Sequence, residues 1–276
     1  MRITDSDVFA IGEPGWNLAD IAAQWEKFKS VYRQAPVLDN AGGMKAPHAF
    51  ASWFMLKSLQ PRTIIESGVW KGQGTWLFEQ ACPDARIISL DVNFSNLEYR
   101  SPNADYVQSD FSLVDFLDTD KRSAICFFDD HQDQFQRLLQ MRWKGFATAI
   151  FEDNYPPNRG DCYSMRKILG GHGFQPEKAS PKGWRSSVRT LVEQRLRIEG
   201  RGIVPASDTH RKEVINALDL YYEFPPLFKE EKTRWGDEWK EIRYPTKPPI
   251  FGPDFTDELR SEALYYTWIC LVRLKS

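Results

Sequence analysis

Residues 63–75, TIIESGVWKGQGT, decide the fold that we expect for this chain. The β-branched run at 63–65 predicts a strand, and glycines at positions 68, 72 and 74 predict a tight turn ahead of a helix. Glycine lets the backbone approach a ligand closely, and the free N–H groups at a helix start attract negative charge. We therefore expect a nucleotide-type cofactor at this turn, with simple chain reversal as the alternative.

Four further short apolar runs follow this turn, and each of them ends in polar or acidic residues. The runs span residues 86–90, 104–107, 124–128 and 147–151. In an open parallel sheet, ligands bind outside the carboxyl ends of the strands, so these ends should meet at one crevice.

Two acids at these strand ends are placed to contact a nucleoside. Asp91 ends the second strand about twenty residues beyond the glycine turn, where an acid binds ribose hydroxyls. Asp110 follows the third run in the stretch Ser109-Asp110-Phe111. For Asp110, a helix N-cap is the structural alternative that the sequence leaves open.

Together these runs predict an α/β fold with a Rossmann-like, doubly wound and mostly parallel sheet. Apolar residues at helical spacing predict an N-terminal helical segment at residues 1–60. We expect the Rossmann-like cofactor-binding core at 61–200, and a cap or insert with a closing strand at 201–276. The apolar stretch 265–274 is typical of that closing strand, which we expect to run antiparallel.

Composition and charge narrow the class of protein. The 276-residue chain is 42% hydrophobic and carries a net charge of -2, which suits a globular protein without a basic field for nucleic acid. No run reaches the roughly 18 apolar residues of a membrane span, so we expect no membrane partner. The four cysteines are widely spaced without a C-x-x-C, as expected of reduced thiols in a cytoplasmic protein.

The glycine turn resembles the E-x-G-x-x-x-G motif of class I S-adenosylmethionine-dependent methyltransferases. Glu66 and Gly68 stand at the first two motif positions, whereas the dinucleotide pattern G-x-G-x-x-G and the Lys-Ser/Thr ending of a P-loop are absent. The resemblance implies that S-adenosylmethionine is the cofactor. The cofactor-binding residues that we expect are Glu66, Gly68, Trp70, Gly72, Asp91, Asp110 and Asp129.

Acidic and amide side chains follow the fourth and fifth apolar runs. Asp129 ends one run and Glu152-Asp153-Asn154 ends the other, so adjacent parallel strands would bring hard oxygen donors together. This donor set suits Mg²⁺ or Mn²⁺, and the sequence has no Cys/His cluster that would favour Zn²⁺.

Both stretches also resemble the paired motifs of metal-dependent O-methyltransferases, in their catechol and macrolide-sugar types. The resemblance covers roughly residues 60–170 and rests on FFDDH at 127–131 and IFEDN at 150–154. The metal ligands that it implies are Asp129, Asp153 and Asn154, with Glu152 as an alternative ligand.

The catalytic base departs from the catechol type, which has a lysine where this chain has Gln132. We expect His131 to act as the base instead, because an imidazole titrates near neutral pH and this one closely follows the first metal ligand. The alternative is a histidine that only orients a neighbouring carboxylate.

The sequence thus predicts an S-adenosylmethionine-dependent, Mg-dependent O-methyltransferase. Its acceptor would be a vicinal hydroxyl of a small molecule, with a sugar or glycoside favoured. Two alternatives stay open: an enzyme of the same fold that processes nucleotides or sugars without methyl transfer, and a non-catalytic cofactor-binding module.

Two further segments bear on the acceptor and on assembly. Residues 223–253 are rich in aromatic and charged residues, which is typical of a lid over a polyhydroxylated substrate or of a homo-oligomer interface. Trp235 and Trp239 lie one helical turn apart and would present one face there. The turn at 39–44 could fold over the cofactor corner with His48 just beyond it, or form a plain interhelix loop.

Overall fold

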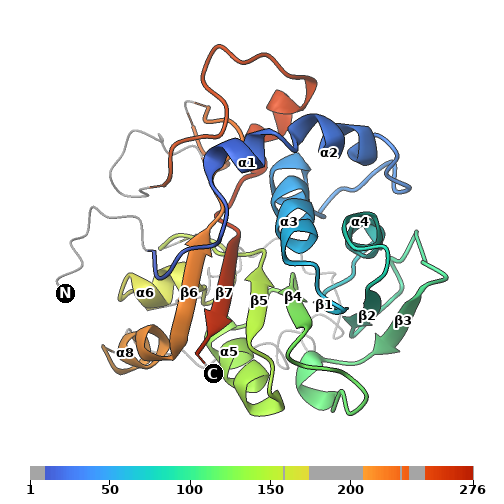
Figure 1. Ribbon diagram of the computed structural model, residues 1–276, viewed down its shortest axis with the longest axis vertical. Coiled ribbons are helices and arrows are strands. Elements are labelled where there is room, and N and C mark those ends of the chain that lie inside the picture. Colours follow the sequence, from blue (N-terminus) through green and yellow to red (C-terminus); the bar gives the residue numbers. More distant parts are fainter. Residues whose placement is uncertain (1–9, 158, 174–207, 231, 236–245, 276) are drawn as a thin grey trace, which may run out of the picture.

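A computed structural model describes residues 10–157, 159–173, 208–230, 232–235 and 246–275. Its central feature is one sheet of seven strands: β1 (Thr63–Ser67), β2 (Arg86–Asp91), β3 (Ala104–Gln108), β4 (Ala124–Phe128), β5 (Thr148–Phe151), β6 (Leu218–Glu223) and β7 (Cys270–Leu274). The strand order is β3-β2-β1-β4-β5-β7-β6, which can be followed in Figure 1. β1 to β5 are mutually parallel, and β7 is antiparallel to β5 and β6. The predicted Rossmann-like, mostly parallel α/β fold is confirmed.

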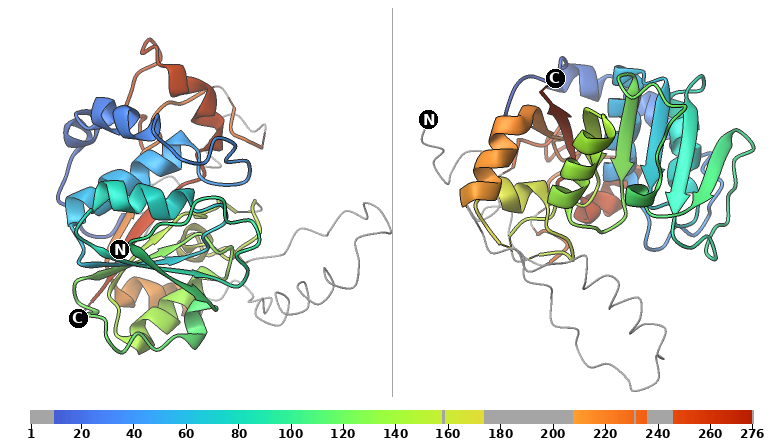
Figure 2. Two further views of the ribbon diagram at one scale, coloured as in Figure 1. Left: turned by 90° about the vertical axis from the view of Figure 1, so that its right-hand side faces the viewer. Right: turned by 90° about the horizontal axis from the view of Figure 1, so that it is seen from below.

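Helices cover both faces of this sheet. The α-helices are α1 (Leu18–Ala22), α2 (Trp25–Tyr32), α3 (Ala46–Leu59), α4 (Gln73–Ala81), α5 (Gln134–Lys144), α6 (Met165–Leu169) and α8 (Asp208–Ala217), and the 3-10 helices are η1 (Phe111–Leu113) and η2 (Glu258–Tyr265). Figure 2 shows α1 to α4 on one face of the sheet and α5, α6 and α8 on the other. The predicted N-terminal helical segment is therefore one of two covering layers.

The alternation of side chains along the strands explains why the sheet has two cores. In β1, Ile64 packs with α2, α3 and α4, whereas its neighbour Ile65 packs with α5 and α6. In β4, Phe127 and Phe128 divide between the two faces in the same way. Successive strand residues point to opposite faces, so a continuous apolar run is what a doubly covered parallel sheet requires.

The closing strand is present, but it is shorter than predicted. Of the predicted strand 265–274, Tyr265 belongs to η2, and Trp268 has a left-handed backbone with φ 63°, which interrupts the extended chain just before β7 begins at Cys270. The sequence analysis did not predict β6, which includes Glu223, the first residue of the expected insert. The expected boundary between core and cap, at residues 200 and 201, lies outside the described residues.

No helix within the described ranges is long and apolar enough to cross a membrane.

Gly68, directly after β1, is a position that tolerates no side chain. Its φ is +96°, and a Cβ built there would lie 2.1 Å from the carbonyl oxygen of Asp129, the residue that follows β4. The Gly68 amide donates to the carbonyl oxygen of Leu90 in β2 at 2.9 Å. Glycine is required here both by its backbone conformation and by the approach of a neighbouring chain.

We predict that Gly68→Ala lowers the free energy of unfolding by about 3 kcal/mol or more, because left-handed strain is added to a backbone clash. Gly15→Ala is the matched control, since Gly15 has a similar φ of +88° but no atom within 4 Å of its built Cβ. Gly15→Ala should lower the free energy of unfolding by only about 1 kcal/mol. Urea denaturation of both variants measures the difference, and equal losses would contradict the assigned contact.

Candidate functional site

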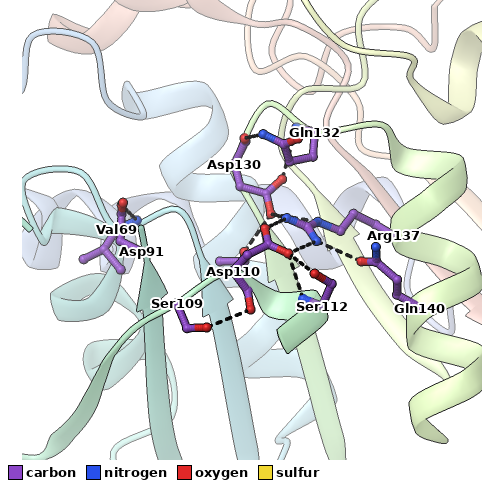
Figure 3. Close-up of polar contacts among 10 residues, drawn as sticks. Val69, Asp91, Ser109, Asp110, Ser112, Asp130, Gln132, Arg137 and Gln140 are labelled. Carbon is purple, nitrogen blue, oxygen red and sulfur yellow. Dashed lines mark hydrogen bonds and ion pairs between the residues drawn. The ribbon is translucent and has the colours of Figure 1, made fainter. Parts of the chain in front are cut away.

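The glycine turn and Asp91 form one hydrogen-bonded corner at the carboxyl ends of β1 and β2. Asp91 Oδ2 accepts hydrogen bonds from the backbone amides of Val69 at 2.9 Å and Trp70 at 3.3 Å. Figure 3 shows Asp91 beside Val69 at this turn. The structure thus brings together four of the predicted cofactor residues, Gly68, Trp70, Gly72 and Asp91.

The turn at 39–44 folds over this corner, as one of the two interpretations of the sequence expected. The indole Nε1 of Trp70 donates to the carbonyl oxygen of Ala41 at 3.0 Å, and Lys71 Nζ donates to the carbonyl oxygen of Asp39 at 2.5 Å. Trp70 remains 42% exposed, so its ring is still open to a ligand.

Glu66, predicted as a cofactor residue, lies beneath the corner rather than on its surface. It is 1% exposed and accepts hydrogen bonds from the hydroxyls of Thr75 at 2.5 Å and Ser89 at 2.7 Å. Burial raises the pKa of the Glu66 carboxyl to about 8. A Cβ at Gly74 would lie 2.4 Å from Glu66 Oε1, so this carboxyl supports the start of α4 from inside.

We predict that Glu66→Gln becomes more stable relative to the wild type as pH rises from 5 to 8. The folded protein holds the Glu66 proton up to a pKa of about 8, whereas the unfolded chain loses it near 4.5. The stabilisation from this group is therefore complete below pH 4.5 and is lost at about 1.4 kcal/mol per pH unit up to about pH 8.

Urea denaturation at several pH values tests this dependence, with Glu213→Gln as the control for loss of an exposed carboxylate. A stability difference between Glu66→Gln and the wild type that does not change with pH would contradict the assignment.

Asp110 caps η1 and is also held by a buried arginine from α5, as Figure 3 shows. Arg137 donates from Nη1 and Nη2 to the two Asp110 oxygens, at 3.0 and 2.5 Å. Burial opposes ionisation of Asp110, but hydrogen bonds and charge from Arg137, together with Ser112, lower its pKa to about 2. The N-cap that the sequence left open is therefore present, and the cofactor role of Asp110 stays a prediction.

Arg137 joins three strand ends, and the sequence analysis missed it. Its Nε donates to Asp130 Oδ2 at 3.0 Å, and the same oxygen accepts from the Ser67 hydroxyl at 2.6 Å. The Arg137 side chain is only 3% exposed. An arginine on a helix usually lies in solvent, so nothing in the local pattern marked this one as a clamp across the ends of β1, β3 and β4.

An acidic group lies at the ends of β4 and β5. Asp129, His131 and Asp153 each place one potential ligand atom within 4.8 Å of the other two, which makes this a candidate metal centre among the described residues. Burial and the nearby charge of Glu152 raise the pKa values of Asp129 and Asp153 well above the usual range. Carboxylates crowded in this way favour either a bound proton or a bound cation.

His131 lies between two of these carboxylates. Its Nδ1 is 3.1 Å from Asp153 Oδ2 and 3.1 Å from Asp161 Oδ1. The charge of Asp153 raises the pKa of His131 to about 11 against the effect of burial, and Asp161 adds to the rise. The imidazole is thus protonated at neutral pH here, which fits the alternative of a carboxylate-orienting histidine. Its role as a base stays a prediction.

The two other predicted metal ligands make contacts within the protein. Glu152 Oε1 is 2.5 Å from Nδ1 of His48. Asn154 is fully buried, donates from Nδ2 to the Tyr221 hydroxyl at 2.9 Å, and accepts at Oδ1 from the Arg166 amide at 2.8 Å. The geometry therefore favours Asp129 and Asp153 over Asn154 as ligands, and the roles of Glu152 and Asn154 stay predictions.

The residues of the acidic group fit a divalent cation. Asp153 Oδ2 is buried and accepts no hydrogen bond from any described residue, although His131 lies nearby. The two carboxylates of Asp129 and Asp153 supply the oxygen donors that Mg²⁺ and Mn²⁺ prefer.

The insert reaches this region through Trp235. The Trp235 ring stacks on Trp268 with centroids 6.0 Å apart, and it meets the Tyr155 ring edge-on at 6.1 Å. Tyr155 in turn interacts with Asp153 of the acidic group. Trp239, the predicted partner of Trp235, lies outside the described residues, and the choice between a lid and an oligomer interface stays open.

No protein-family model and no curated protein matches the chain. Solved structures do match it. A structure of CmcI with Mg and S-adenosylmethionine is 25% identical, and the match covers 43% of this chain and 58% of CmcI with a TM-score of 0.32. This match therefore spans less than two thirds of the CmcI chain in that structure.

Two further matched structures are methyltransferases by name. The O-methyltransferase TomG from Streptomyces achromogenes, in complex with S-adenosylmethionine, is 15% identical, with 67% of this chain and 78% of TomG covered and a TM-score of 0.35. The methyltransferase PaMTH1 from Podospora anserina, bound to S-adenosylhomocysteine, is 10% identical. The match covers 99% of this chain and 92% of PaMTH1, with a TM-score of 0.42.

Proposed function

We propose that this chain is an S-adenosylmethionine-dependent, Mg-dependent O-methyltransferase. One observation carries the proposal: the acidic group of Asp129, His131 and Asp153 lies next to the glycine turn, because the Asp129 backbone packs directly against Gly68. A cofactor held at the turn and an acceptor held at the acidic group would therefore meet at one edge of the sheet.

The residues of the glycine turn and those of the acidic group have different roles in this proposal. Asp91 and the glycine turn would hold the nucleoside end of the cofactor, which would supply an activated methyl group. Asp129 and Asp153 hold the divalent cation, whose charge favours loss of the proton from one of two vicinal hydroxyls. His131 orients Asp153 in this proposal, because its imidazole is held in the protonated form between two carboxylates.

For the acceptor we propose a sugar or glycoside. The support is the aromatic cluster beside the acidic group, in which the partly exposed Trp235 ring stacks on the buried Trp268 ring and meets the buried Tyr155 ring edge-on. The accessible face of the Trp235 indole suits the apolar face of a sugar ring, while the cation site suits its vicinal hydroxyls. A catechol-like ring is the competing acceptor, and methyl transfer to a panel of glycosides and catechols distinguishes them.

We predict that Asp91→Ala weakens S-adenosylhomocysteine binding by about 1.5–3 kcal/mol, the scale of a hydrogen bond to a charged group. Isothermal titration calorimetry measures the change. Asp105→Ala is the matched control, because Asp105 is an exposed carboxylate on the neighbouring strand β3 and pairs with Arg86. Binding of NAD in place of the thioether ligand, or equal losses in the two variants, would refute the cofactor assignment.

We also predict that EDTA abolishes methyl transfer and that Asp153→Asn lowers Mn²⁺ affinity at least tenfold, because a charged ligand is lost. Electron paramagnetic resonance of bound Mn²⁺ gives the affinity independently of turnover. Asp118→Asn, which alters an exposed aspartate away from the group, should leave both properties unchanged. Full activity in excess chelator would exclude the metal role.

A further inference from the structure

His48 connects three distant parts of the chain at the edge of the acidic group. It lies in α3 and is 1% exposed. Its Nδ1 is 2.5 Å from Oε1 of Glu152, the residue after β5, and its Nε2 accepts a hydrogen bond from the Thr267 amide at 2.8 Å. Neither the mechanism above nor the sheet itself requires this contact.

The hydrogen bond from the Thr267 amide shows which ring nitrogen of His48 carries the proton. A backbone N–H can only donate, so Nε2 of His48 must present a lone pair to it. The ring proton is then on Nδ1, and Nδ1 donates to Glu152. His48 is therefore held as one tautomer, with one end fixed by the main chain and the other end bound to a carboxylate.

The surroundings hold the ring in this orientation. Tyr266 packs edge-on against the imidazole, with ring centroids 5.6 Å apart and an interplanar angle of 88°. The Glu152 backbone is fixed as well, since its amide donates to the carbonyl oxygen of Phe128 at 3.0 Å. The Glu152 side chain is 12% exposed, and its carboxyl interacts with those of Asp129 and Asp153.

We propose that His48 is a positioning residue for the cation site: by binding Oε1 of Glu152, it holds this carboxylate beside Asp129 and Asp153, so that Glu152 can serve the cation as a third carboxylate. The inference rests on the proposed function, because it assumes a divalent cation at that group. It makes the affinity for the cation depend on the docking of α3 and of residue 267 onto the sheet. Contacts behind a ligating carboxylate typically change metal affinity by 10–100-fold.

Two substitutions of His48 by amide residues test its two hydrogen bonds independently. In His48→Asn the amide nitrogen takes the place of Nδ1 and can still donate to Glu152, but the acceptor for Thr267 is lost. In His48→Gln the amide oxygen can accept from Thr267, but the longer side chain places no donor at the position of Nδ1, where Glu152 is bound. Both changes remove the same ring from the same buried position, so each serves as the control for the other.

The measurement is Mn²⁺ affinity by electron paramagnetic resonance, alongside thermal unfolding and S-adenosylhomocysteine binding. We expect His48→Gln to weaken Mn²⁺ binding at least tenfold and His48→Asn to weaken it less than about threefold. Adding His48→Gln to Glu152→Ala should cause no further loss, because His48 acts through Glu152. Equal Mn²⁺ affinities for the two amide variants, or a full additional loss in the double variant, would overturn the proposal.

A second measurement uses the unchanged protein and so does not depend on folding of a variant. The chain has four histidines, which keeps assignment of their ring nitrogens tractable by long-range ¹H–¹⁵N NMR. The His48 proton should reside on Nδ1, with Nε2 unprotonated. A proton on Nε2 would remove the hydrogen bond on which the inference depends.

Failure of the inference can be told apart from failure of the proposed function. If the wild type binds no Mn²⁺, the cation site itself is wrong and the inference falls with it. If the wild type binds Mn²⁺ and both His48 variants bind it equally well, the cation site stands and only the positioning role of His48 is wrong.

Discussion

The contact between Gly68 and the Asp129 backbone is the constraint on which the rest of the site depends. β1 lies between β2 and β4, and the Asp129 amide donates to the Ser67 carbonyl oxygen at 2.9 Å just where β1 ends. A residue with a side chain at position 68 would force these chains apart. Because Gly68 has no side chain, the glycine turn with Asp91 and the end of β4 with Asp129 lie next to each other. The candidate cofactor site and the acidic group therefore share one edge of the sheet.

Several carboxylates lie close together at this edge of the sheet, and basic side chains from three elements contact them. Arg137 from α5 holds Asp110 and Asp130, His131 lies against Asp153, and His48 from α3 binds Glu152. A buried carboxylate without a partner is strongly destabilising, so each donor both stabilises the fold and fixes the direction of an oxygen. Asp129 and Asp153 are left with raised pKa values, which is the state that a bound cation would relieve.

The N-terminal helices and the segment before β7 therefore do more than cover the sheet. The turn at 39–44 contacts Trp70 at the cofactor corner, and α3 delivers His48 to the acidic group. Trp235 stacks on the buried Trp268, which lies just before β7, and meets the Tyr155 ring edge-on. Elements outside the parallel core thus line the region where an acceptor would bind, while the sheet supplies the fixed strand ends.

The sequence alone determined the sheet and the location of its functional edge. Local signals were sufficient for this, because apolar runs of strand length, glycines at 68 and 72 and acids at strand ends are properties of neighbouring residues. The antiparallel strand near the C-terminus was predictable for the same reason, although the left-handed Trp268 shortened it. The sequence also predicted that Asp129 and Asp153 lie close together, because adjacent parallel strands align their carboxyl ends.

Only the tertiary structure decided which side chains are free to act. Asn154 is taken up by Tyr221 and the Arg166 amide, Glu152 by His48, and Asp110 by Arg137. These partners come from helices and strands far away in sequence, and their choice depends on burial and on the direction of single bonds. Such contacts leave no local pattern: Arg137 looks like any surface arginine on a helix and His48 like a packed core histidine until the layers close on the sheet.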